Sequence, residues 1–296
     1  MSIPMPGSDL NMRDATAVCH LFDQAAEASL DSAVRDGGIA LLPPVGCVIM
    51  TGDLHDNGLN FRRILKLAKL HKLTENHLVL HEIIHGSHFV NGADMSIRTL
   101  IQVAALKLEF PNRVHLMHAN HELAQLGGEG ILKDGVSIVE AFDDGVDFMF
   151  GTDADFVREA MKRFIRSFLV AVKTPNGCLL SHSIPSQRHI DGFDLSVLER
   201  VPTEKDLSSQ GDVYKMVWGR YQNDEVMDYL KKEWGVRHFI TGHQPAEMGY
   251  EIQGKSMIIL ASDHNHGVAL PINLSKVYEF NELIDAIVPL ASISVD

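Results

Sequence analysis

The sequence of 296 residues is 45% hydrophobic, which is enough apolar material for a large core in one domain, or for two small domains. Its formal net charge of −13 argues against a nucleic-acid backbone or an anionic membrane as the main partner, although a bound metal can reverse the local field and admit small phosphorylated substrates. Three scattered cysteines predict no disulfide framework and, with neither a signal-peptide pattern nor an uncharged apolar run long enough to cross a bilayer, we expect a cytoplasmic protein.

The first half of the chain alternates predicted helices and strands. Apolar residues at helical spacing predict helices at 14–35, 60–72 and 96–109, and short apolar runs predict strands at 46–51, 77–80 and 113–117. Ser96 is expected to cap the third helix, and Pro111 to stop it. This alternation is typical of a layered α/β domain.

The second half is richer in predicted strands. Residues 124–176 carry Gly and acidic residues around mixed apolar segments and a strong helix at 153–172, so we expect a helical insertion in a single domain spanning 1–296. Further strands are predicted at 177–183, 238–244, 256–262 and 268–274, and a helix at 224–235.

Side chains of metal-ligand type follow five of these strands. They are Asp53 and His55, Glu82 and His85, Asn120 and His121, then His182, and finally His243. Asp53 and His55, two residues apart, would face the same way in an extended segment. On its own this pair is more typical of an ordinary turn than of a metal site, but five such strand exits in succession are not typical of turns. Carboxylate, imidazole and amide ligands without thiolate suit two divalent ions such as Mn, Fe or Zn.

The ordered series TGDLHDN, LVLHEIIHG, HANHE, LLSHS and TGHQ resembles the motifs of the calcineurin-like metallophosphoesterases, and most closely those of the serine/threonine protein phosphatase branch. The resemblance covers about residues 45–275. It implies a four-layer α/β/β/α sandwich of mixed sheets flanked by helices. It also implies hydrolysis of a phosphate ester by a water activated between two metal ions, on a phosphoprotein, a nucleotide or a small phosphate ester.

The resemblance also implies roles for individual residues. Asp53 and His55 would bind the first metal, Glu82 would bridge, and Asn120, His182 and His243 would complete the second metal site. His121 matches the catalytic histidine, and His85 stands where the family has the Asp that orients it. Substrate contacts are expected from Arg220, Arg188, His264 and His266, with Arg220 the best replacement for a phosphate-binding Arg.

Several positions depart from the family pattern. Glu82 replaces an Asp, His85 replaces an Asp, and Gly86 replaces the phosphate-binding Arg. Asp56 and Ala119 each replace a Gly. These changes predict an altered substrate or a reduced activity, and they keep open the alternative of a catalytically impaired, metal-binding relic of the same fold.

A second enzyme hypothesis rests on residues 81–85, which read HEIIH and match the H-E-x-x-H motif of zinc peptidases. That motif requires a sustained helix, whereas this segment directly follows a predicted strand. It would also leave the other candidate ligands unexplained. By default His81, His88 and His118 are expected to be loop histidines that bind no metal.

Overall fold

The computed structural model describes residues 5–86, 89–128, 132–133 and 135–295. Its helices are α1 Ala15–Leu30, α2 Gly58–Ala68, α3 Ile97–Glu109, α4 Asn120–Gly127, α5 Ile138–Phe150, α6 Ala154–Arg166, α7 Gln187–Ile190, α8 Glu204–Leu207, α9 Asp212–Val217, α10 Asp224–Trp234 and α11 Phe280–Asp285. Its strands are β1 Arg35–Asp36, β2 Ile39–Leu41, β3 Cys47–Thr51, β4 His77–Leu80, β5 Phe89–Val90, β6 Ala93–Asp94, β7 Val114–Leu116, β8 Leu132–Lys133, β9 Val136–Ser137, β10 Ala171–Lys173, β11 Cys178–Ser181, β12 His238–Thr241, β13 Tyr250–Gln253, β14 Met257–Leu260, β15 Val268–Asn273 and β16 Val288–Pro289.

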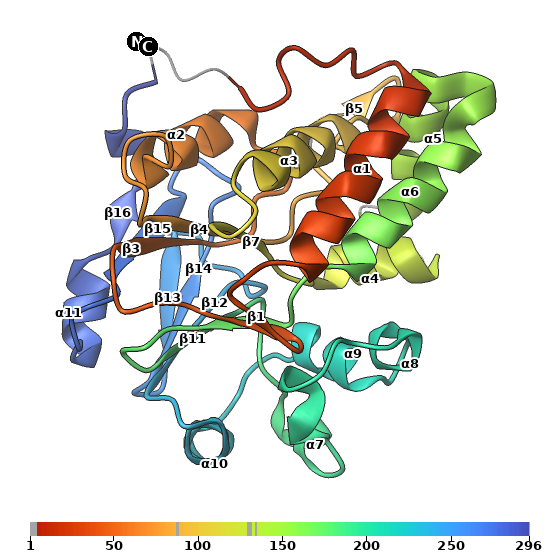
Figure 1. The fold of residues 1–296 in the computed structure, drawn as a ribbon. Helices are drawn as coiled ribbons and strands as arrows, with labels where there is room; N and C mark the ends of the chain where they lie inside the picture. Colours follow the sequence, from red (N-terminus) through yellow and green to blue (C-terminus); the bar gives the residue numbers. More distant parts are fainter. Residues whose placement is uncertain (1–4, 87–88, 129–131, 134, 296) are drawn as a thin grey trace.

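Two mixed sheets form the centre of the molecule (Figure 1). The smaller has five strands in the order β16-β15-β3-β4-β7, in which β3, β4 and β7 run parallel and β15 runs antiparallel to β3. The larger has seven strands in the order β1-β2-β10-β11-β12-β14-β13, in which β11, β12 and β14 run parallel. Parallel neighbours end at the same edge of a sheet, so each sheet gathers several strand exits on one side.

Alternating side chains create the layers. In β3, Val48 and Met50 pack between the two sheets, whereas Ile49 faces a core that includes residues of α1, α2 and α3. In β14, Leu260 packs between the sheets and Ile259 faces the core around α9 and α10. Because β-strand side chains alternate, each sheet is apolar on both faces and is covered twice. The predicted four-layer α/β/β/α sandwich is therefore confirmed, with helices outside both sheets (Figure 1).

The segment 124–176 differs from the expected helical insertion. Besides the helix predicted there, it contains α5, and it ends in β10, which pairs with β2 and β11 in the larger sheet. The helix predicted to reach residue 172 ends at Arg166, because Ala171 and Val172 enter that sheet. Helix α6 packs on α1, where the rings of Phe22 and Phe164 stack at 5.5 Å.

Two further details differ from the sequence-based expectation. The first helix ends at Leu30, and the short strands β1 and β2 follow it. Ser96 precedes α3, but its side chain makes no capping hydrogen bond. Its hydroxyl instead accepts a hydrogen bond from the backbone N–H of His85 at 3.1 Å, which ties the start of α3 to the loop after β4. Among the described helices, none combines the length and apolar character needed to span a bilayer.

Candidate metal centre

The exits of β3, β4, β7, β11 and β12 meet where the two sheets approach each other. The backbone of Asp53, just past β3, pairs in parallel with Ala261, just past β14. The N–H of Ser262 donates to the carbonyl of Asp53 at 3.0 Å, and the N–H of His243 donates to both oxygens of the Asp53 carboxylate at 3.0 Å. These hydrogen bonds hold loops from both sheets around one buried centre.

Three ligand-type atoms of this centre lie close to a fourth, His182 Nε2. His182 Nε2 lies 2.7 Å from Asn120 Oδ1 and 3.1 Å from His243 Nδ1, and the latter two atoms are 2.8 Å apart. Glu82 Oε2 lies 3.4 Å from His182 Nε2. Metal–ligand bonds of about 2.0–2.2 Å place neighbouring ligand atoms about 3 Å apart, so these separations suit one shared ion. These are the residues expected at the second metal site.

The other oxygen of Glu82 faces a second group. Glu82 Oε1 lies 3.6 Å from His55 Nε2 and 3.4 Å from His121 Nε2. These three side chains form one of two titratable clusters, within the described residues, whose geometry could hold a metal. The carboxylate of Glu82 therefore lies between two ligand groups, although it is one methylene longer than the Asp of the family pattern.

Asp53 belongs to the other cluster rather than to that of His55. Its Oδ1 lies 3.4 Å from His81 Nδ1 and 3.5 Å from His182 Nδ1. The three groups thus differ from the expected division, in which Asp53 and His55 bind one ion. His81, expected to be an ordinary loop histidine, is fully buried at the centre.

The charge balance of the centre fits bound cations. Glu82 is only 2% exposed, and its Oε2 has no hydrogen-bond partner among the described residues. Burial raises the pKa of Asp53 to about 8 and that of Glu82 well above its usual value, and repulsion between the carboxylates, including Glu122, adds to both shifts. Arg220 is the positive side chain that lowers both pKa values. Buried carboxylates ionise at low cost only beside positive charge, so divalent ions suit these residues.

Backbone strain concentrates at the same place. Nine non-glycine residues of the described chain have positive φ, and five belong to the centre: His55, Asp56, Glu82, His85 and His243. Such conformations cost of order 1 kcal/mol each or more and persist where the surrounding structure enforces them. This concentration indicates a functional site, where the direction of the side chains matters more than the free energy that the strained backbone costs.

Two departures from the family pattern, Asp56 and Gly86, are in contact, and each accounts for the other. A Cβ added to Gly86 would lie 2.6 Å from the Cβ of Asp56, so a side chain at 86 has no room. Asp56 in turn accepts a hydrogen bond from the Thr99 hydroxyl of α3. The side chain at 56, where the family has Gly, therefore excludes the Arg expected at 86.

The zinc-peptidase alternative is not supported by this geometry. Residues 81–86 form no helix, and the Glu82 and His85 backbones have φ values of 49° and 60°. The side chains of His81 and His85 face different partners: His81 Nδ1 lies 2.9 Å from His182 Nδ1, and His85 Nδ1 lies 3.0 Å from His121 Nδ1. They cannot share one ion as the peptidase motif requires.

The expected substrate residues are only partly gathered. The charge of Arg220 acts on Asp53, Glu82 and His243, which places it beside the centre. Arg188 is exposed on α7 and acts on His189 instead. His264 and His266 contact each other and Ala246, with no hydrogen bond to the expected ligands.

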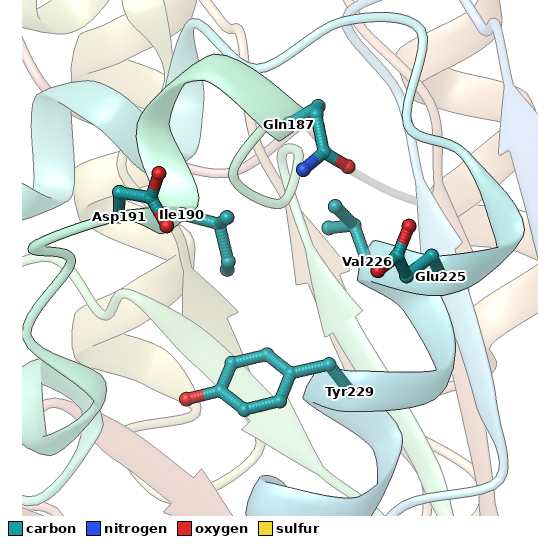
Figure 2. Close-up of a pocket in the computed structure, with 6 residues that line it drawn as sticks. All are labelled: Gln187, Ile190, Asp191, Glu225, Val226 and Tyr229. Carbon is teal, nitrogen blue, oxygen red and sulfur yellow. The ribbon is translucent and has the colours of Figure 1, made fainter.

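A separate hollow of about 300 Å³ lies between α7 and α10 (Figure 2). It is lined by Gln187, Ile190, Asp191, Glu225, Val226 and Tyr229. None of these residues belongs to the metal centre described above.

Sequence reasoning missed three contributors to the centre. His81 is one. Glu122 is another: its Oε1 accepts a hydrogen bond from the backbone N–H of Ile83 at 2.7 Å and so holds the loop after β4. The third is Gln125, whose Oε1 lies 2.9 Å from His85 Nε2. Glu122 lies in the HANHE motif, which was the available signal. His88, expected to be a loop histidine, lies outside the described residues.

Comparison with known proteins supports the fold. No protein-family model matches the sequence, and no curated protein is significantly similar to it. Among solved structures, the chain is similar to a protein serine/threonine phosphatase from Saccharomyces cerevisiae, described as similar to human phosphatase PP5, with TM-score 0.65 and 14% identity over 87% of this chain and 82% of that one. It is also similar to a cold-active protein-tyrosine phosphatase of a psychrophilic Shewanella species, with TM-score 0.54 and 16% identity over 84% of this chain and 80% of that one. The chain therefore shares its α/β/β/α sandwich fold with these two phosphatases.

Proposed function

We propose that this protein is a metal-dependent phosphoesterase that hydrolyses a phosphate ester, as serine/threonine protein phosphatases do. The observation that carries the proposal is the position of Glu82. Its two oxygens face two different groups of ligand-type atoms, one with His55 and His121 and one with Asn120, His182 and His243. One carboxylate shared by two ligand groups is the arrangement that a dinuclear hydrolase requires.

The proposed ligands are His55 and Glu82 for one ion and Glu82, Asn120, His182 and His243 for the other. Asp53, whose Oδ1 lies 3.5 Å from His182 Nδ1, is the further carboxylate of the centre. Mn, Fe and Zn all suit such nitrogen and oxygen donors. Two such ions, when bound, supply an activated water and Lewis acidity at the phosphoryl oxygens.

The chain's own residues supply positioning and proton transfer. His121 lies at the edge of the centre. In its protonated form, His121 can donate the proton on Nε2 to the leaving oxygen of the ester. Arg220 makes no hydrogen bond or ion pair with the described residues, so its guanidinium is available to bind phosphate oxygens in a bidentate manner.

One observation favours the alternative of a catalytically impaired metal-binding protein. The group beside His121 is an imidazole, His85, whose pKa burial lowers to about 4. A neutral neighbour stabilises a protonated His121 less than a carboxylate would. This predicts a slow rather than an absent reaction, because the ligand groups are retained.

The test is hydrolysis of p-nitrophenyl phosphate and bis-p-nitrophenyl phosphate by protein loaded separately with Mn, Fe or Zn. We expect turnover that is abolished by Asp53→Asn and lowered at least about 100-fold by His121→Ala. His20→Ala, a change in helix α1 outside the centre, is the matched control. If the loaded protein binds two ions but hydrolyses neither ester, nor any phosphopeptide or nucleotide offered, the relic alternative replaces this proposal.

A further inference from the structure

The two histidines of HEIIH remain unexplained by the proposed function. Both are buried, and both flank Glu82 along the chain. Each makes one close nitrogen–nitrogen contact with an imidazole that faces Glu82. His81 contacts His182 at 2.9 Å, and His85 contacts His121 at 3.0 Å. At such a distance one nitrogen must carry a proton and the other must accept it, so the direction of each hydrogen bond can be derived.

For His81, the far nitrogen fixes the direction. His81 Nε2 lies 2.9 Å from the carbonyl oxygen of Thr51, which can only accept, so Nε2 carries the ring proton. In the neutral ring Nδ1 then has the lone pair. His182 must therefore donate from its own Nδ1, which leaves the lone pair of His182 on Nε2. That nitrogen is the one beside Asn120, His243 and Glu82.

For His85, a longer chain of contacts gives the same answer. Arg158 holds the carboxylate of Asp143, which accepts a hydrogen bond from Gln125 Nε2 at 3.0 Å. The amide oxygen of Gln125 therefore faces His85 Nε2, at 2.9 Å, and that nitrogen carries the proton. His85 Nδ1 accepts, and His121 donates from Nδ1. The Nε2 of His121 then points toward Glu82 Oε1, at 3.4 Å.

We propose that the histidines of HEIIH are positioning residues: His81 fixes the ring tautomer of His182, and His85 fixes that of His121, so that both rings present Nε2 toward Glu82. The inference rests on the proposed function for its purpose, because a metal-binding or proton-carrying Nε2 is useful only there. Hydrogen bonding to the second ring nitrogen is the general means by which proteins orient metal-binding imidazoles. Here an imidazole backed by an oxygen acceptor replaces the usual carboxylate or carbonyl.

A direct ligand role for His81 is the competing interpretation. His81, Asp53 and His182 form a cluster that could hold a cation. However, a neutral imidazole has one lone pair, and the Nε2 of His182 already faces three ligand-type atoms. Binding an ion at Nδ1 as well would require loss of the ring proton of His182. The hydrogen bond from His182 to His81 needs no such loss.

The experiment compares His81→Phe, His85→Phe and the control His118→Phe. Phenylalanine keeps a planar ring and removes the acceptor. His118 is equally buried, and neither of its ring nitrogens has a hydrogen-bond partner in the described chain. His81→Asn, whose amide oxygen can accept near the position of Nδ1, is the conservative variant that should restore the interaction.

The first readout is the tautomer of each ring in metal-free protein, from long-range ¹H–¹⁵N correlation spectra of histidine-labelled samples. We expect Nδ1–H in both His182 and His121 of the wild type. His81→Phe should release only His182 from this tautomer, and His85→Phe only His121. An Nε2–H tautomer of His182 in the wild type would overturn the inference. So would an Nδ1–H tautomer of His182 that stays unchanged in His81→Phe.

The second readout is metal affinity. We expect His81→Phe to weaken one bound ion by about 10- to 100-fold, while His81→Asn and His118→Phe keep the wild-type affinity. Three ions per chain in the wild type, falling to two in His81→Phe, would instead make His81 a ligand and refute the positioning role. If the wild type binds no metal and hydrolyses no ester, the proposed function fails, yet the metal-free tautomer spectra still decide the relation between the rings.

Discussion

Gly242 lies where the two sheets meet, and replacing it with alanine is the sharpest structural perturbation of the centre. A Cβ at this position would lie 2.3 Å from Asp53 Oδ1 and 2.6 Å from His81 Cε1. Real Cβ contacts essentially never fall below 3.0 Å, so the Asp53 carboxylate must retreat by about 0.7 Å. Asp53 has little freedom to do so, because the N–H of His243 binds both of its oxygens at 3.0 Å.

The expected result of Gly242→Ala is a folded protein with a damaged centre. Displacements approaching 1 Å at a catalytic site cost about 100-fold in rate, which corresponds to about 2.7 kcal/mol of transition-state stabilisation. We expect a comparable loss in kcat/KM for p-nitrophenyl phosphate and weaker metal binding. The control is Gly58→Ala in α2, where a Cβ meets nothing within 4 Å. Wild-type activity and metal affinity in Gly242→Ala would refute the placement of Asp53 beside Gly242.

Three further predictions concern charge. Arg220→Ala should raise KM for phosphate esters about 10-fold or more, and Arg220→Lys should recover part of this loss. Arg188→Ala should leave KM unchanged. Equal effects of the two alanine variants in steady-state kinetics would contradict the assignment of Arg220 to the site. Removing bound metal with a chelator should lower the melting temperature, and adding Mn back at about 100 times its Kd should restore about 2.7 kcal/mol of stability; an unchanged melting temperature would speak against bound ions. Burial lowers the pKa of Lys107 to about 7, against about 10.4 in an unfolded chain, so the unfolded state holds the extra proton between these values. The unfolding free energy of the wild type should therefore rise with pH relative to Lys107→Met, by up to about 1.4 kcal/mol per unit; urea unfolding at pH 7 and pH 9 with the same difference would contradict this.

Local patterns were sufficient for the strands that end at the centre, but not for α4, which carries Asn120 and His121. The strand at 77–80 and the helix start near Ser96 follow from apolar runs and turn residues, and the strand exits follow because parallel strands end together. Short elements were not predictable in this way. Strands β1 and β2 have two and three residues, too few for a periodic pattern. The end of α6 and the start of β10 share apolar, β-branched residues that fit either structure.

Pairings across the fold were also beyond local patterns. His81 looks like a loop residue because its partner, His182, is 101 residues away in sequence. The relation between Asp56 and Gly86 likewise depends on the approach of two loops, which the family comparison registers only as two separate departures. The grouping of Asp53 with His81 and His182, instead of with His55, depends on the backbone bridge to Ala261 on the other sheet.

Elemental analysis of the protein, purified without added metal and then titrated with Mn, shows directly whether the centre binds two ions. We expect about two ions per chain, in both the wild type and the Gly58→Ala control, with at least one ion lost in Glu82→Ala. A content near zero that does not rise on adding Mn would contradict this expectation, because the buried carboxylates would then be held without the cations that their burial requires.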